Sequence, residues 1–472
     1  MHGNAAARFC DSAHCARSVA RVYGTATLIE HEGMRFLPSL GFVVVAPAIL
    51  VALSGGCGGP PVAPPPGPPA PKLTPPKPVA AVPSRLSAPE VDRAIRAAWT
   101  AAGVTPAKPA DDATWLRRVT FDIVGAPPSP EDVLAFVADK SPDKRAKKVD
   151  ALLASPLYAT HWTNVWDDIL VGHDVRDPRL DRAELRAWLH GRFSANAPWD
   201  KMVAELVSAT GQNSEGGTRN ALPMDVPTPD APNGMAGMNG MGGTSGVTSD
   251  APTAASGAQG VNGAVNYTLR FQTPQDLAGS ASRTFLGVQI QCAQCHDHKT
   301  EKWKQDDFRK LTAAFLHAEI EPIDKGQTKG IRRVIVSDTA RVQARSAKNA
   351  ELAPIAAATP TALDGTVLDK GKETRKELAT WMTSPKNPWF AKAYVNRIWA
   401  HFVGRGFVNP VDDLRVGNPT TLPETLEAMA KDFAENGFDT KALIRLVCAS
   451  EVYGLDARGE ENIAPENVTW AR

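Results

Sequence analysis

The apolar residues of this chain recur at the spacing of an α-helix. In residues 88–104, Val91, Ile95 and Trp99 fall on one face of a helix of 3.6 residues per turn. Comparable spacing returns in most patterned stretches up to Tyr453. The sequence therefore predicts a protein whose core is built by packed amphipathic helices.

Helix boundary signals support this prediction. A helix is expected to begin at Asp111 or Asp112 and to stop before Gly125, and the next is expected to open at Ser129-Pro130, with serine as the cap and proline in the first turn. Residues 302–320 are also expected to be helical, and only residues 330–338 resemble a strand convincingly. The predicted fold class is mainly α-helical, with two helical domains, one or few short strands and long disordered segments.

Two stretches without periodicity divide the chain. Residues 58–87 are rich in proline and predict an extended tether, whereas residues 212–266 are rich in glycine, serine and methionine and predict a flexible insertion. The expected organisation is an upstream segment and signal (1–57), the tether (58–87), the first part of a helical domain (88–211), the insertion (212–266), the second part of that domain (267–320), a connecting region (321–371) and a C-terminal helical domain (372–472).

The N-terminal region predicts export. Met34 and Arg35 precede an apolar run over residues 36–53, and small residues then lead to Cys57. This order is typical of a lipoprotein signal, with Cys57 as the lipidated residue; an uncleaved membrane anchor is the alternative. We therefore expect an extracytoplasmic protein that is lipid-anchored to a membrane, in the periplasm or at the cell surface.

Net charge and sequence motifs limit the classes of function that the sequence supports. The chain has 52 basic and 51 acidic residues, which does not favour nucleic acid as a partner. It contains no Gly-x-Ser-x-Gly, phosphate-loop or His-Glu-x-x-His motif, so the sequence leaves undecided whether it is an enzyme.

The cysteines point to one candidate site. Once those at or before Cys57 are set aside, Cys292, Cys295 and Cys448 remain, and Cys448 lies on an apolar helical stripe that predicts a core position. Cys292 and Cys295 are followed directly by His296, which forms the Cys-x-x-Cys-His pattern of c-type haem attachment. Here the cysteines would anchor haem c, and His296 would ligate its iron.

Two alternatives stay open at this motif. A zinc or iron ion could be held by the cysteines with His296 or with His298, which is a further candidate ligand, but the remaining ligands would have to come from elsewhere. A local disulfide is the other alternative. A sixth haem ligand is not identified by the sequence, although five residues have a suitable side chain: His173, His317, His401, Met202 and Met382.

Other conspicuous residues have structural explanations. We expect the tryptophans in and beside predicted helices to belong to the core. Arg117 and Arg118, and Arg397 with Asp412 and Asp413, are expected to form structural ion pairs, with a binding cleft as the alternative.

Several long motifs resemble a known family. Residues 116–136, 152–170 and 285–315, the last containing "CAQCHDH", resemble the cytochrome-like domain of planctomycete-type exported proteins, domain of unknown function 1549. Residues 378–414 are similar to its usual companion, domain of unknown function 1553. The resemblance implies a cytochrome-like role without naming an activity.

This chain departs from the family pattern in two places. The family usually continues Pro-Phe-Asp after the motif, where this chain has Lys299-Thr300-Glu301, and its second domain normally extends further past the region of Tyr453. The leading expectation is single-electron transfer through covalently bound haem, with an extracytoplasmic redox protein as partner. The rivals are a binding or scaffold protein with a structural metal and an exported enzyme of unknown substrate.

Overall fold

The computed structural model describes residues 86–173, 177–216, 260–324, 330–339, 349–369, 371, 373–456 and 470–471. The chain divides into two units, Met1–Lys77 and Pro78–Arg472, and all described residues belong to the second. The predicted signal, Cys57 and nearly all of the tether lie outside the described residues. So do residues 217–259 of the predicted insertion.

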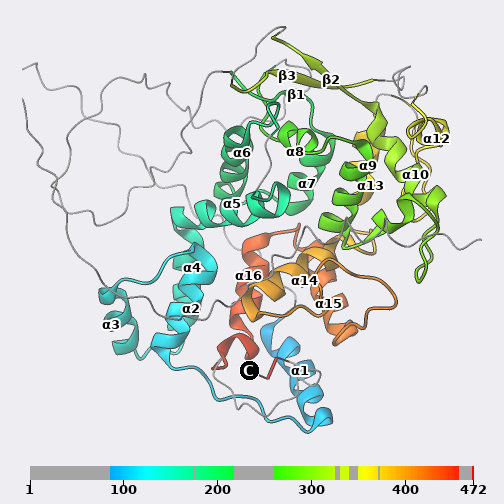
Figure 1. The fold of residues 1–472 in the computed structure, drawn as a ribbon. Helices are drawn as coiled ribbons and strands as arrows, with labels where there is room; N and C mark the ends of the chain where they lie inside the picture. Colours follow the sequence, from blue (N-terminus) through cyan, green and yellow to red (C-terminus); the bar gives the residue numbers. More distant parts are fainter. Residues whose placement is uncertain are drawn as a thin grey trace, which may run out of the picture. The chain divides into compact units, whose positions relative to one another are not determined.

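Helices form most of the described chain, as the sequence predicts (Figure 1). The first half contains α1 (Ala88–Ala102), α2 (Asp112–Val124), α3 (Pro130–Ala138), α4 (Lys144–Ala154), α5 (Pro156–Leu170), α6 (Arg182–Ser194) and α7 (Trp199–Ser208). After the insertion come α8 (Val265–Leu269), α9 (Pro274–Ala281), the π-helical turn η1 (Ser282–Leu286), the 3-10 helix η2 (Ile290–Gln294), α10 (Gln305–Ala313) and the 3-10 helix η3 (Ala314–His317). The C-terminal part contains α12 (Ala353–Ala357), α13 (Thr374–Met382), α14 (Phe390–Val403), α15 (Pro423–Glu435), α16 (Thr440–Ala449) and η4 (Val452–Gly454).

Helix α2 begins and ends, and helix α3 begins, at the capping residues that the sequence predicts. The Asp111 side chain accepts a hydrogen bond from Thr114 N at the start of α2, and Gly125 ends the helix with a φ of 72°. Such a positive φ is available to glycine at little cost. At α3, the Ser129 side chain accepts from Asp132 N.

Three short antiparallel strands form a small sheet in the order β1-β3-β2. The predicted strand is β3 (Val334–Asp338), flanked by β1 (Gly211–Gln212) and β2 (Ala318–Pro322). The expected helix over residues 302–320 was wrong at its end, because the helical turns finish at His317 and the following residues pair with β3. Pairing with a strand distant in sequence overrides the local helical pattern there.

The ends of the predicted insertion belong to the fold. Gln212 pairs with β3 and also bridges Val261, and Asn262 Nδ2 donates to Thr210 O. The chain on the two sides of residues 217–259 therefore meets at the small sheet.

A continuous cluster of buried apolar side chains includes residues from both halves of the chain. At its centre the Tyr394 ring of α14 lies 4.4 Å from that of Trp199, 5.9 Å from Trp166 and 5.1 Å from Phe433, between ring centroids. The prediction of core tryptophans is confirmed. Of the eleven tryptophans, three are partly buried against the core (Trp188, Trp381, Trp389) and eight are buried (Trp99, Trp115, Trp162, Trp166, Trp199, Trp303, Trp399, Trp470). Cys448 is also buried, as expected.

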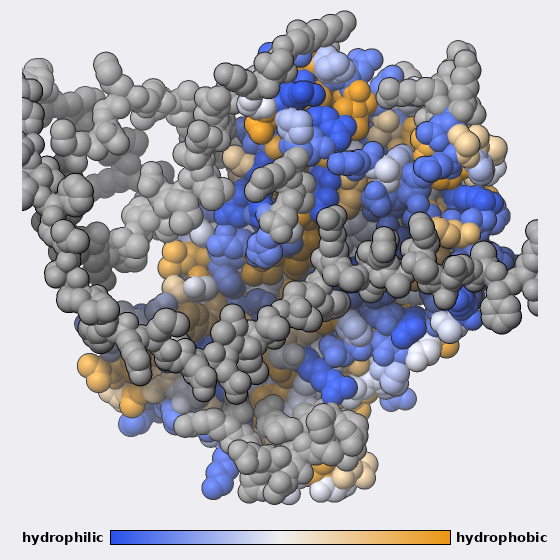
Figure 2. Space-filling view, in the orientation of Figure 1, coloured by the Kyte–Doolittle hydropathy of each residue, from blue (hydrophilic) through white to orange (hydrophobic). Residues whose placement is uncertain are grey.

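The outer surface is mostly polar on the face drawn in Figure 2, with apolar residues gathered at the lower left over α3. Leu134 and Val137 of α3 are 73% and 39% exposed. In the ranges given above, no helix has the length and apolar character needed to cross a bilayer.

We predict that Tyr394→Ala destabilises the fold by about 3–5 kcal/mol, because it leaves a cavity between aromatic rings from both halves of the chain. Tyr394→Phe is the matched control: it keeps the ring and loses only the 2.8 Å hydrogen bond to Thr440 Oγ1, at about 1 kcal/mol. Urea unfolding measures both. If the two variants lost the same free energy of unfolding, a central packing role for this ring would be contradicted.

Candidate functional site

The Cys-x-x-Cys-His motif follows a sharp turn at Gly287, which has a φ of 65°. Leu414 N donates to Gly287 O at 2.7 Å, and a side chain at Gly287 would place its Cβ 2.9 Å from the Leu414 side chain. The loop after α14 therefore packs directly on the segment that leads into the motif. Glycine is required here both for its backbone conformation and for this close approach.

Cys292 lies in η2, and Cys295 is the residue that directly follows this 3-10 helix. A 3-10 helix has three residues per turn, so the spacing of the two cysteines is one turn. Ile290 and Ala293 of η2 are buried. Cys292 and Cys295 are exposed free thiols, so the predicted alternative of a local disulfide is not formed in this structure.

The His296 ring is exposed, and its Nδ1 lies 2.7 Å from the carbonyl oxygen of Asp297. A carbonyl can only accept, so Nδ1 carries the proton and donates it. In the neutral ring this leaves the Nε2 lone pair free to bind a metal. Hydrogen bonding of the other ring nitrogen is the usual way in which a metal-ligating histidine is oriented.

His298 has the opposite arrangement. Its Nδ1 accepts from Thr300 N at 3.3 Å and from Glu301 N at 3.1 Å, so the proton of the neutral ring lies on Nε2. The residues that depart from the family pattern, Lys299 to Glu301, thus form a turn that closes on His298. This geometry favours His296 over His298 as a ligand.

A small cavity of about 220 Å³ adjoins Cys292. Its walls include the rings of Trp303 and Trp389, whose centroids are 6.2 Å apart, and Lys302 Nζ lies 4.7 Å from the Trp303 ring centroid. The cavity is smaller than the 300–1,000 Å³ or so of typical enclosed ligand sites. A large flat group attached at Cys292 would therefore remain largely exposed.

The five residues whose side chains could supply a sixth haem ligand each have other neighbours in the structure. Met202 and Met382 are buried in the core, His317 Nδ1 bonds with Thr339 O, and His401 packs against Trp162. His173 Nδ1 lies 3.7 Å from Asp168 Oδ1. Among the described residues, no group of three or more histidine, cysteine, aspartate or glutamate side chains converges as a metal site.

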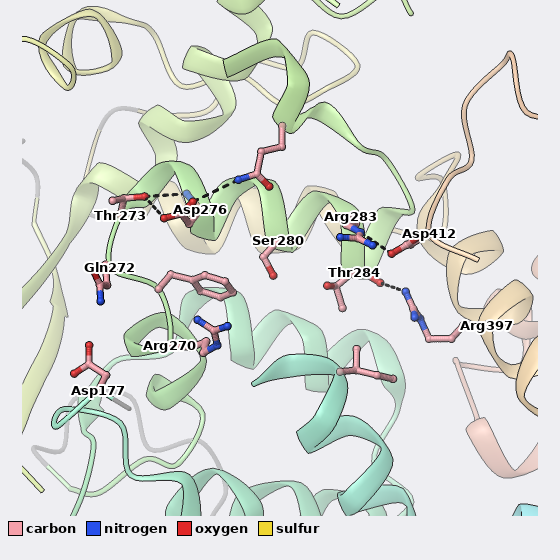
Figure 3. Close-up of a pocket in the computed structure, with 13 residues that line it drawn as sticks. Asp177, Arg270, Gln272, Thr273, Asp276, Ser280, Arg283, Thr284, Arg397 and Asp412 are labelled. Carbon is pink, nitrogen blue, oxygen red and sulfur yellow. Dashed lines mark hydrogen bonds and ion pairs between the residues drawn. The ribbon is translucent and has the colours of Figure 1, made fainter. Parts of the chain in front are cut away.

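A second and larger cavity of about 800 Å³ is lined by Gln291, the neighbour of Cys292. We call it the arginine cleft, because Arg270, Arg283 and Arg397 also line it (Figure 3). The motif helix η2 therefore contributes adjacent residues to two hollows.

The arginine cleft corrects one sequence prediction. Asp412 pairs with Arg283 at 2.6 Å and Asp413 with Arg415 at 3.1 Å, so neither forms the expected ion pair with Arg397. Arg397 instead faces the cleft, which was the alternative. The expected pairing of Arg118 also differs, since its guanidinium donates to the carbonyls of Tyr453 and Leu455. Arg117 lies over the Phe121 ring, with its guanidinium carbon 5.7 Å from the ring centroid.

A titratable cluster that the sequence did not suggest joins α2, α5, α14 and η4. Tyr453 Oη donates to Asp122 Oδ2 at 2.8 Å, and the ring centroids of His161 and His401 are 5.9 Å apart. Burial raises the pKa of Asp122 to about 6, against the opposing hydrogen bond from Tyr453. Burial, with the charge of His401, lowers the pKa of His161 to about 4.

These shifts predict opposing pH dependences of stability. The folded state keeps a proton on Asp122 that the unfolded chain has already released, so this group makes stability fall as the pH rises toward 6. The unfolded chain protonates His161 more readily, so this group makes stability rise over pH values of about 4 to 6.5.

We predict that Asp122→Asn removes the fall in stability that Asp122 causes as the pH rises, and leaves the rise in stability that His161 causes. The stability of the variant relative to the unsubstituted protein should then increase as the pH rises toward 6 and level off above it. Urea midpoints measured between pH 4.5 and 7.5 test this, with the exposed Asp143→Asn as control. A stability difference that does not change with pH would contradict the buried state of Asp122.

Comparisons with known proteins agree with the resemblance seen in the sequence. Residues 90–319 match the family described as PSCyt2, protein of unknown function (DUF1549), and residues 374–472 match PSD1, protein of unknown function (DUF1553). No curated protein and no solved structure matches the chain. The expected domain order is confirmed.

Proposed function

We propose that this chain, which belongs to the proteins that carry DUF1549 followed by DUF1553, binds haem covalently and transfers single electrons to or from an extracytoplasmic partner protein. The observation that carries the proposal is the state of the three motif side chains. Cys292 and Cys295 present free, exposed thiols, and the hydrogen bond from His296 Nδ1 to Asp297 O leaves Nε2 of the neutral ring as the nitrogen that can bind a metal.

These residues suit haem attachment. Each thiol would form a thioether by adding its S–H bond across a vinyl double bond, which requires reduced and accessible cysteines like those seen here. His296 would ligate the iron through Nε2, held in orientation by the hydrogen bond from Nδ1. The bound haem would supply one-electron chemistry between Fe(II) and Fe(III).

The position of the motif supports exchange of electrons with another protein. Cys292, Cys295 and His296 are all exposed, and the cavity beside Cys292 is too small to enclose a haem. A haem held there would keep an edge open to solvent and to a partner. A lipid anchor at Cys57 would keep this site near a membrane surface outside the cytoplasm.

A structural zinc or iron ion is the alternative for the same residues. Zinc sites of this kind use four protein ligands in a tetrahedral arrangement. In the parts of the chain that the structure describes, the motif has no such set of convergent ligands. The alternative therefore requires ligands from other residues or a local rearrangement.

We predict that the protein, produced together with c-type haem maturation proteins, gives a haem-peroxidase band on a denaturing gel. Cys292→Ser with Cys295→Ser should abolish the band, because no thioether can form. Cys448→Ser should keep it, since that thiol is buried away from the surface. A folded protein that contains no haem but one zinc per chain would overturn the proposal.

The two motif histidines should behave differently. His296→Ala should keep the covalent haem but change the absorption spectrum of the ferric protein, because the iron loses its protein ligand. His298→Ala should leave the spectrum nearly unchanged and weaken only the turn at Thr300 and Glu301. The reverse pattern would assign the ligand role to His298.

A further inference from the structure

The arginine cleft contains positive charge that the protein does not neutralise. Arg270 donates from Nε to Val171 O at 2.8 Å, and Arg397 makes one long contact of 3.5 Å from Nη2 to Thr284 O. Within the described ranges neither guanidinium forms an ion pair. A guanidinium offers five N–H donors, so most donors of both residues lack a protein acceptor.

The acidic residues of the cleft are already satisfied. Asp412 accepts from Arg283 at 2.6 Å, and Asp177 accepts from Arg179 at 2.7 Å. Asp276 accepts from Thr273 Oγ1 at 2.6 Å, in the cap of α9. Asp276 is hydrogen-bonded only by the neutral Thr273 and Gln291, so its charge also stays in the cleft. Against this one carboxylate stand the two guanidinium groups of Arg270 and Arg397, so the charges without an ion-pair partner sum to a net positive one.

The two arginines reach the cleft from different sides. In Figure 3, Arg270 extends from the segment after α8 and Arg397 from α14, while Ser280 and Thr284 lie between them on α9 and η1. A π-helical turn such as η1 is often found at functional sites. The lining thus combines two separated cations with intervening hydroxyl groups.

The state of Arg397 also points to a missing counter-charge. The residue is half-buried, and burial lowers the pKa of its guanidinium from the usual value despite the nearby Asp412. Leaving a charged donor without a partner in such a place is costly. A bound anion would remove that cost.

The cleft joins the two family segments. Arg270, Ser280 and Thr284 lie within residues 90–319, whereas Arg397 and Asp412 lie within residues 374–472. Its volume of about 800 Å³ falls in the range of sites for small organic ligands. Neither segment could form this site alone.

We propose that the arginine cleft binds a small organic anion that carries at least two oxyanion groups, one held by Arg270 and one by Arg397. Carboxylate, sulfate and phosphate groups all match the planar fork of a guanidinium. The hydroxyls of Ser280 and Thr284 would contact the polar body between the two charged groups. This site uses neither Cys292 nor Cys295, so it is independent of the proposed haem.

Isothermal titration of the full chain tests the proposal with three probes that each carry at least two oxyanion groups: citrate, fructose 1,6-bisphosphate and a disulfated disaccharide. We expect saturable one-to-one binding of at least one probe, weaker binding of acetate and none of sucrose. Which probe binds best identifies the oxyanion type. Binding should weaken as salt is added, because the contacts are ionic.

Arg270→Gln and Arg397→Gln should each weaken binding about tenfold or more, which is the usual effect of removing a charged hydrogen-bond donor. Arg445→Gln is the matched control, because Arg445 is a surface arginine outside the cleft that pairs with Asp150. The variant with both Cys292→Ser and Cys295→Ser should bind as the unsubstituted chain does.

Circular dichroism establishes that each variant is folded. If Arg397→Gln does not fold, Arg270→Gln and Arg270→Lys still test the site, with lysine keeping the charge but losing the fork. Absence of saturable binding for all three probes would overturn the proposal. Equal affinity of the folded arginine variants and the Arg445→Gln control would do the same.

Discussion

The Tyr394 ring packs against aromatic rings from both halves of the chain and so joins the two halves in one core. Trp166 of α5, Trp199 of α7 and Phe433 of α15 all stack on the Tyr394 ring. Aromatic pairs at these separations combine large buried areas with a preferred geometry. They fix α14 against α7 and α5, whose tryptophans precede Tyr394 by 195 and 228 positions.

The placement of α14 has two consequences for the candidate sites. Arg397, one turn after Tyr394 on the same helix, enters the arginine cleft, and the loop beyond the helix reaches the motif segment. There Leu414 N bonds with Gly287 O, and Arg283 pairs with Asp412. The segment that matches DUF1553 therefore supports and partly lines sites whose other residues belong to DUF1549. This gives a physical reason for the two domains to act as one unit.

Local signals in the sequence predicted much of the fold. The caps at Asp111 and Ser129 and the periodicity of the helices were sufficient to place α2 and α3. The strand at Ala318–Pro322 was missed, because its pairing with β3 depends on residues that local periodicity does not report. The same limitation explains why the ion pair predicted for Arg397 was wrong. Its expected partners, Asp412 and Asp413, instead pair with Arg283 and Arg415.

The chemistry of the motif was visible in the sequence, whereas its geometry was not. Spacing alone suggested Cys292, Cys295 and His296, but only the structure distinguishes the hydrogen bonding of His296 from that of His298. The Asp122–Tyr453 contact joins residues 331 positions apart and had no local signal. Long-range contacts of this kind arise from packing, so single-sequence patterns cannot reveal them.

Mass spectrometry of the tryptic peptide spanning residues 284–299 can show whether Cys292 and Cys295 hold a haem, as we propose. The peptide should be isolated from protein made in cells that export it and mature c-type haem. We expect the peptide to carry the added mass of one haem and to contain no free thiol. Recovery of the peptide with both cysteines as free thiols, or joined in a disulfide, would contradict it.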